Sequence, residues 1–351
     1  MAETTGQDLK QEVVDTDLGR FNVYLQGDLG HAEAIILTVH DLGCNHTMYN
    51  DFVNHPSMKE LTSRVVWIHV DLPGQEENAP DLPADYRFPT MAEMGGCLGV
   101  VLDKLGVTRP VMCFGEGAGA NILARFAICH PMKVHGLCLI HCTGTTAGIM
   151  ETMKDKVMQW KLDHFGMTPS TAAYLVMHRF GSTWQQEGKK FEAVDKQMEQ
   201  IVEDFRNKLK KEVNPKNLTK FVDSFMKRSE LLPDLKNITC FVLLVTGEKA
   251  SFNHTCKTLE VNFRKSIENK KKLESLEVEG VANVIVERPE KLAEAFLYFM
   301  QGAGLVSSIG MPKIGKGVRT RSVSMEEADM PKIRTGSLST SPPKTDGQTG
   351  Q

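Results

Sequence analysis

Apolar residues gather in short runs along this chain, and stretches with helical spacing separate most of them. Five such runs, rich in β-branched residues, cover 35–40, 65–70, 111–115, 134–141 and 239–247. Continuous apolar runs of this length are typical of strands buried on both faces, as in a parallel sheet covered by helices. The pattern therefore predicts an α/β fold with a mostly parallel central sheet.

Other segments predict how this sheet begins and what covers it. Residues 12–27 hold two strand-like stretches around Asp17-Leu18-Gly19, a turn signal that predicts an antiparallel hairpin. Helices are expected at 91–105, 118–130 and 290–300; Pro131 ends the second, and Pro289 precedes the third. These elements place the main domain at residues 12–302, after a disordered N-terminus of residues 1–11.

Strand signals vanish between Gly148 and Leu232, where the chain becomes rich in Met, Lys and Glu with helical spacing. We predict a helical cap inserted over the carboxyl edge of the sheet. Two roles fit the methionines of this segment, which are Met150, Met153, Met158, Met167 and Met177. They could form an adaptable surface for a partner protein, or they could belong to the apolar stripe that the cap buries against the sheet, which we favour. Residues 303–351 are dominated by Ser, Thr, Gly, Pro and Lys, which predicts a disordered tail.

The composition of the chain argues against several classes of protein. The 41 basic and 44 acidic side chains among 351 residues leave a net charge of −3, so no strong field draws the folded body to nucleic acid. The N-terminus has no apolar signal region, and no run is long enough to span a bilayer. The eight cysteines lack CxxC spacing, which favours reduced thiols over disulfides or zinc. We expect a cytoplasmic protein, with peripheral membrane binding left open, and no metal or cofactor.

The first candidate catalytic motif lies where the third parallel run meets a predicted helix. The segment from Gly115 through Gly117 to Gly119 joins a buried strand to a helix through small residues. This is the pattern of the nucleophile elbow, G-x-S-x-G, which lifts a serine above the sheet of an α/β-hydrolase. Here Gly117 stands in the serine's place and supplies no oxygen to attack a carbonyl.

Two further motifs make the resemblance specific. His40-Asp41-Leu42-Gly43 follows one strand, and Asp71-Leu72-Pro73-Gly74-Gln75-Glu76-Glu77 follows the next. Together with the elbow, they resemble the N-myc downstream-regulated (NDRG) family over roughly residues 30–300. The resemblance implies an α/β-hydrolase fold without hydrolase activity, and a role in growth control, differentiation, stress response or membrane trafficking.

The other two members of a hydrolase triad are also missing. Ala250 stands where the acid usually follows a late strand, and Ala282 stands where the histidine base would precede the last helix. Loss of all three members removes the proton path that activates an attacking group. Glu248 or Asn283 could be offset substitutes, to which we give a small chance, and Cys113 fits packing inside its strand better than catalysis.

Residues in and around the elbow also fit other functions. The segment Gly115-x-Gly117-x-x-Ala120 also satisfies a dinucleotide fingerprint, but it follows the third parallel run rather than the first and lacks an acidic partner. A displaced-site hydrolase or a pocket for a small molecule or lipid headgroup remains open, because polar residues follow several strands at the edge where α/β folds bind ligands. They are His40, Asp41, Asp71, Glu116 and His141.

The tail carries the pattern that basophilic kinases read. Arg319 and Arg321 precede Ser324 in an R-x-R-x-x-S match, and Arg334 precedes Ser337 in a shorter form. Each phosphate adds about −1.5 to −2 charge beside these arginines. The candidate sites are Ser322, Ser324, Ser337 and Ser339, and the resemblance favours a phosphorylated tail. We thus predict a catalytically inactive scaffold or signalling protein that engages proteins, or phosphoinositide or other lipid headgroups.

Overall fold

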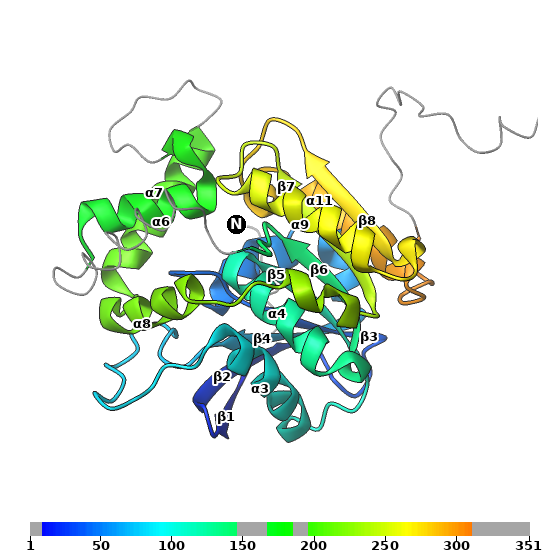
Figure 1. Cartoon of the computed structure of the whole chain (residues 1–351), viewed down its shortest axis with the longest axis horizontal. Coiled ribbons are helices and arrows are strands. Elements are labelled where there is room, and N and C mark those ends of the chain that lie inside the picture. Colours follow the sequence, from blue (N-terminus) through cyan, green and yellow to red (C-terminus); the bar gives the residue numbers. More distant parts are fainter. Residues whose placement is uncertain (1–8, 146–166, 185–195, 311–351) are drawn as a thin grey trace, which may run out of the picture. The chain divides into compact units, whose positions relative to one another are not determined.

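The computed structural model describes residues 9–145, 167–184 and 196–310 (Figure 1). Over these residues, one sheet has the strand order β1-β2-β4-β3-β5-β6-β7-β8. Its strands are β1 (Lys10–Thr16), β2 (Gly19–Gln26), β3 (Ala34–Val39), β4 (Val65–Asp71), β5 (Val111–Glu116), β6 (Val134–Ile140), β7 (Phe241–Gly247) and β8 (Leu273–Val278). The β1–β2 and β2–β4 pairs are antiparallel, and the pairs from β4 through β8 are parallel. The predicted α/β class is confirmed.

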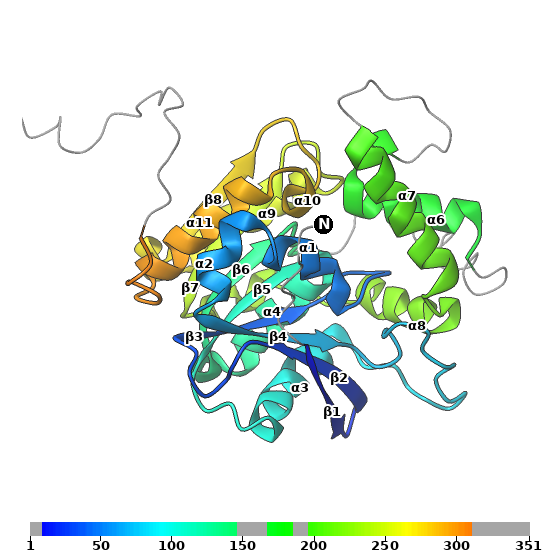
Figure 2. The same cartoon turned by 180° about the vertical axis from the view of Figure 1, so that it is seen from behind.

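Helices cover both faces of this sheet. On one face lie α3 (Met91–Lys104), α4 (Gly117–Cys129) and α9 (Asn253–Ser266), whose apolar residues join a single core with β3, β5 and β6. On the other face lie α1 (Asn50–Val53), α2 (Lys59–Thr62), α10 (Val284–Glu287) and α11 (Pro289–Gly302), as the reverse view shows (Figure 2). Because the central strands are covered twice, their residues are apolar without alternation.

The cap consists, where it is described, of α6 (Pro169–Phe180), α7 (Lys196–Lys211) and α8 (Pro215–Met226). Each buries an apolar stripe: Leu175 and Val176 on α6, Phe205 and Leu209 on α7, and Phe221 on α8 are buried and join the main core. Figure 1 shows the three helices together on one side of the sheet. They behave as the expected cap, because their apolar faces pack inward.

Strand β8 and helix α9 are the longer elements that the sequence pattern did not predict. Strand β8 reads Leu-Glu-Ser-Leu-Glu-Val and buries only its two ends, because it is an edge strand. Helix α9 is polar along most of its length and buries Cys256, Leu259 and Phe263. Elements with so few buried positions leave a weak periodic signal.

The limits of the folded body also differ slightly from expectation. Strand β1 begins at Lys10, so the start of the hairpin falls within the N-terminal segment that was predicted to be disordered. At the other end Val306 and Ile309 are buried, so the body continues to Gly310 rather than stopping at residue 302. The candidate phosphorylation sites Ser322, Ser324, Ser337 and Ser339 lie outside the described residues, as do Met150, Met153 and Met158. No helix in the described ranges has the length and apolar character of a bilayer span.

Candidate functional site

The elbow between β5 and α4 has the backbone of a nucleophile elbow. Strand β5 ends at Glu116 and α4 begins at Gly117, whose φ of +56° lies in the left-handed region that favours glycine. Gly119 is required for a second reason: a Cβ there would lie 2.7 Å from the carbonyl carbon of Val39. Strand β3 and helix α4 therefore approach too closely for any side chain at 119.

The space that a serine side chain would need at position 117 is taken by Asp41, from the loop after β3. A Cβ on Gly117 would lie 2.5 Å from Asp41 Oδ2 and closer still to Oδ1. Real Cβ atoms essentially never approach another heavy atom within 3.0 Å. A side chain of any kind at 117 would thus have to displace the carboxylate.

Asp41 also occupies the oxyanion hole. In α/β-hydrolases this hole is formed by the N–H of the residue after the nucleophile and an N–H from the loop after the third strand. The corresponding groups here are the N–H of Ala118, which donates to Asp41 Oδ1 at 2.8 Å, and the N–H of Leu42, which helps to lower the pKa of the Asp41 carboxylate. A permanent carboxylate thus stands where a hydrolase stabilises a transient oxyanion.

His178, from cap helix α6, completes this arrangement. Its Nε2 lies 3.1 Å from Asp41 Oδ2, and the two side chains are 5% and 2% exposed. The rings of Phe225 and Phe252 pack around the imidazole. The sequence analysis missed His178, because it lies far from the strand ends and only the folded cap brings it to the elbow.

The pKa of Asp41 reflects these contacts. Burial by itself would raise the pKa, but His178 and the N–H groups of Ala118 and Leu42 outweigh burial and hold the pKa below its ordinary value of 3.8. As pH falls, the unfolded chain binds its proton near the ordinary value while the folded chain stays ionised, so folding stability is lost. The contribution of Asp41 is therefore present above about pH 4 and disappears as pH falls through the folded-state pKa.

We expect this effect in a comparison with Asp41→Asn, which keeps the shape but cannot ionise. Urea unfolding midpoints of both proteins would be measured from pH 6 to pH 3. The advantage of the native chain should shrink below about pH 4. If the difference between the two urea midpoints stayed unchanged down to pH 3, the contacts of Asp41 would not favour its ionised form.

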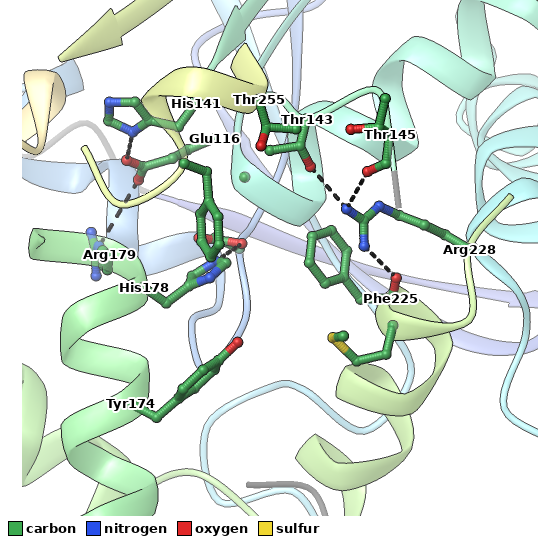
Figure 3. A pocket seen from close by; sticks show the side chains of 14 residues that line it. Glu116, His141, Thr143, Thr145, Tyr174, His178, Arg179, Phe225, Arg228 and Thr255 are labelled. Carbon is green, nitrogen blue, oxygen red and sulfur yellow. Dashed lines mark hydrogen bonds and ion pairs between the residues drawn. The ribbon is translucent and has the colours of Figure 1, made fainter. Parts of the chain in front are cut away.

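A second buried carboxylate, Glu116, belongs to the elbow itself and directly precedes Gly117 (Figure 3). Its Oε1 accepts hydrogen bonds from Asn283 Nδ2 at 2.8 Å and His141 Nδ1 at 3.0 Å, and its Oε2 lies 3.9 Å from Arg179 Nε. The N–H of Gly247 donates to His141 Nε2 at 3.2 Å, so that nitrogen acts as an acceptor. Arg179 then supplies the positive charge that balances Glu116.

The structure divides the five sequence-predicted pocket residues into two groups. Asp41, Glu116 and His141 line one pocket, together with His178 and Arg179 from the cap. The remaining lining residues are Gly117, Thr143, Thr145, Tyr174, Phe225, Met226, Arg228, Phe252 and Thr255. The free space among them amounts to about 30 Å³, which is room for about two water molecules.

His40 and Asp71 instead organise the loops beneath that pocket. His40 donates from Nδ1 to the carbonyl of Asp41 at 2.9 Å and accepts from the N–H of Leu72 at 3.2 Å; its burial lowers its pKa. Asp71 accepts both the backbone N–H of His46, at 2.5 Å, and His46 Nδ1, at 2.8 Å. Neither side chain lines the pocket.

The positions of the absent acid and base are covered by the cap. A Cβ on Gly181, at the end of α6, would lie 2.9 Å from the Ala282 Cβ and 3.1 Å from the Lys249 carbonyl oxygen. Of the offset substitutes, Asn283 binds Glu116 and caps α10, and Glu248 accepts from the N–H of Gly280 in an exposed turn.

Cys113, the thiol nearest the elbow in sequence, lies inside the core. Cys113 is fully buried in β5, and burial raises the pKa of its thiol well above the ordinary value, so the thiol stays protonated. Among residues 9–145, 167–184 and 196–310, no three His, Cys, Asp or Glu side chains are grouped as a metal ion would require.

Comparison with known proteins gives a family match over most of the chain. The sequence profile of the Ndr family matches residues 11–307. An uncharacterized protein of Caenorhabditis elegans is 42% identical over 318 residues, which cover 90% of each chain. Protein NDRG3 of Xenopus laevis is 30% identical over 340 residues, covering 93% of this chain and 84% of its own.

Solved structures share the fold at low sequence identity. An esterase of Thermogutta terrifontis aligns with a TM-score of 0.66 and 15% identity, over 84% of this chain and 99% of its own. The enol-lactonase of Burkholderia xenovorans aligns with a TM-score of 0.61 and 13% identity, over 83% of this chain and 100% of its own. At such identities the likeness extends to the fold alone.

Proposed function

Because this chain belongs to the Ndr family, whose profile spans residues 11–307, and because its elbow carries no nucleophile, we propose that it is a catalytically inactive scaffold or signalling protein with an α/β-hydrolase fold. The family and the fold are those expected from the sequence. The absence of catalysis, the scaffold role and regulation by the tail are the proposal.

One observation carries the proposal of inactivity. The Asp41 carboxylate accepts a hydrogen bond at 2.8 Å from the N–H of Ala118, one of the two donors that a hydrolase would use for its oxyanion, and the N–H of Leu42, the second, helps to keep the carboxylate ionised. Any acyl substrate would have to displace a charged group that is bound in place by His178. Loss of the nucleophile is thus accompanied by loss of the electrostatic device that supplies much of the rate.

A displaced-site hydrolase is the first alternative. It would need a nucleophile within hydrogen-bond reach of a base. The His–carboxylate pairs at the pocket are His178–Asp41 and His141–Glu116, and in both the carboxylate already accepts bonds from backbone or amide groups. A binding pocket without chemistry is the second alternative, and its free space of about 30 Å³ would have to enlarge for any ligand beyond water size.

An esterase assay tests the proposal of inactivity. We expect purified protein to leave p-nitrophenyl esters from acetate to octanoate at the background rate of hydrolysis. Cys113→Ala is the matched control for thiol chemistry, and it should behave identically. Turnover that scales with protein concentration, and that disappears in Asp41→Asn or Glu116→Gln, would establish the displaced-site hydrolase instead.

The regulatory part of the proposal concerns the tail. We propose that a cytoplasmic basophilic kinase phosphorylates Ser322, Ser324, Ser337 or Ser339, and that the added charge changes which proteins or lipid headgroups the tail engages. The family resemblance supports a role of this kind in growth control, differentiation, stress response or trafficking. No part of the folded body is required for the kinase motif itself.

Truncation tests the tail. The cut belongs after Gly310, because Val306 and Ile309 are buried and removing them would damage the core. We expect kinase-treated and untreated full-length protein to recover different partners, and the chain ending at Gly310 to lose that difference. Identical recovery by all three preparations would remove the tail from the proposal.

A further inference from the structure

The last turn of cap helix α6, Met177 to Gly181, reaches deep into the carboxyl edge of the sheet. We call these five residues the cap anchor. Helix ends expose carbonyl groups without helical partners, and these need other donors. Here the carbonyl of Met177 accepts from the N–H of Gly181, and loops of the sheet supply two further donors to this turn, so the cap and the sheet share the hydrogen bonds that end the helix.

The two donors stand directly after the vacated acid and base positions. Ser251 Oγ, next to Ala250, donates to the carbonyl of Met177 at 2.5 Å. Asn283 Nδ2, next to Ala282, donates to the carbonyl of Arg179 at 3.1 Å. The loops that would carry the acid and the base of a hydrolase therefore bind the cap instead.

The third vacated position binds the same turn through Asp41, which fills the space of the missing nucleophile side chain. Asp41 Oδ2 lies 3.1 Å from His178 Nε2. Arg179 adds a charge contact to Glu116 at 3.9 Å and a hydrogen bond to Cys44 Sγ at 3.4 Å. All three absent triad members are thus replaced by groups that contact one helical turn.

We propose that Asp41, Ser251 and Asn283 form a socket for the cap anchor, and that the seated anchor keeps the elbow pocket closed. His178 and Arg179 belong both to the anchor and to the pocket lining, so withdrawal of the anchor must widen the pocket. Phe225, Phe252 and Tyr174 would then be exposed. The pocket, lined by aromatic rings and by buried charged side chains, is a site that becomes available only when the cap moves.

This inference deepens the proposed function and rests on it in one respect: the socket exists because the triad residues are gone. A failure of either can be recognised separately. Ester turnover would disprove the inactivity without saying anything about cap motion, whereas the experiment below measures cap motion and pocket opening without any substrate.

Hydrogen exchange of the whole chain tests the socket, using His178→Ala and, as a milder change, Ser251→Ala. We expect amides of α6 to exchange about tenfold faster or more in His178→Ala and about twofold to fivefold faster in Ser251→Ala, while strand β5 stays protected. The apolar dye 1-anilinonaphthalene-8-sulfonate should gain fluorescence with His178→Ala, because the pocket's aromatic rings become accessible.

Lys216→Ala is the matched control, because it also removes an ion pair between the cap and a sheet loop. Lys216 pairs with Asp81 at 2.5 Å, but both side chains are more than half exposed, so little change is expected. The socket is refuted if α6 exchanges at native rates in a folded His178→Ala protein, or if α6 and β5 accelerate together. Should His178→Ala fail to fold, the same two criteria apply to Ser251→Ala.

Discussion

Replacement of Gly117 by serine, which restores the residue type of a hydrolase elbow, is expected to destabilise the protein by about 2–5 kcal/mol and to create no esterase. The left-handed φ of +56° contributes about 1–2 kcal/mol with any Cβ. Overpacking against the Asp41 carboxylate, 2.5 Å from the new Cβ at Oδ2, adds about 1–3 kcal/mol. Urea unfolding measures the loss, and p-nitrophenyl butyrate hydrolysis tests for activity.

Gly106→Ser separates the two causes. Gly106 also has a left-handed φ, of +71°, but a Cβ there would have no heavy atom within 4 Å. Its replacement should therefore destabilise by the strain alone, about 1–2 kcal/mol. If Gly117→Ser is no worse than Gly106→Ser, Asp41 does not hold the space above the elbow.

Asp41→Ala tests the same clash by removing the carboxylate that a side chain at position 117 would meet. Combined with Gly117→Ser, it should destabilise by less than the sum of the two single changes, because the pair compete for the same volume. Simple additivity would indicate that the serine finds room elsewhere. Ester hydrolysis by the double variant would point to His178 as the base, since it contacts Asp41 in the native chain and Ala282 offers none.

Removal of the Glu116 carboxylate is expected to have an effect of similar or larger size. Glu116→Ala leaves the buried Arg179 without its neighbouring carboxylate and leaves His141 and Asn283 without their acceptor. Breaking a buried charge pair in this way typically destabilises by about 3–5 kcal/mol. The unfolding free energy in urea would measure the loss.

Asp81→Ala is the control for Glu116→Ala. Asp81 also pairs with a cap residue, Lys216, but at the surface, where exposed ion pairs are worth about 0–1 kcal/mol. If Glu116→Ala lowered the unfolding free energy by no more than Asp81→Ala does, water would have to solvate Glu116 and Arg179. In that case the pocket would be wider in solution than the structure indicates.

Much of the fold could be predicted because its signals are local. The buried parallel strands are continuous apolar runs, and the elbow is recognisable from Gly115, Gly117 and Gly119 within five positions. Strand β8 and helix α9 could not be predicted, because an edge strand and a half-exposed helix bury too few residues to produce a clear period.

The candidate site could also be predicted only in part. Asp41, Glu116 and His141 were predicted from their places at strand ends, where parallel strands bring loops together. His40 and Asp71 occupy equivalent places, yet they bind Leu72 and His46 beneath the pocket. The direction of a side chain depends on the turn that carries it, and strand position alone does not specify that direction.

The sequence by itself determined that this is an α/β fold with an elbow that lacks a serine, because glycine spacing and apolar runs depend on neighbouring residues. Only the tertiary structure decided what replaced the triad. Asp41 lies 76 positions before Gly117 and His178 lies 61 after it, as their residue numbers show, and no periodic signal links them. Packing of the cap against the sheet brings both to the elbow, where the space of the missing serine side chain is filled by a carboxylate that contacts an imidazole.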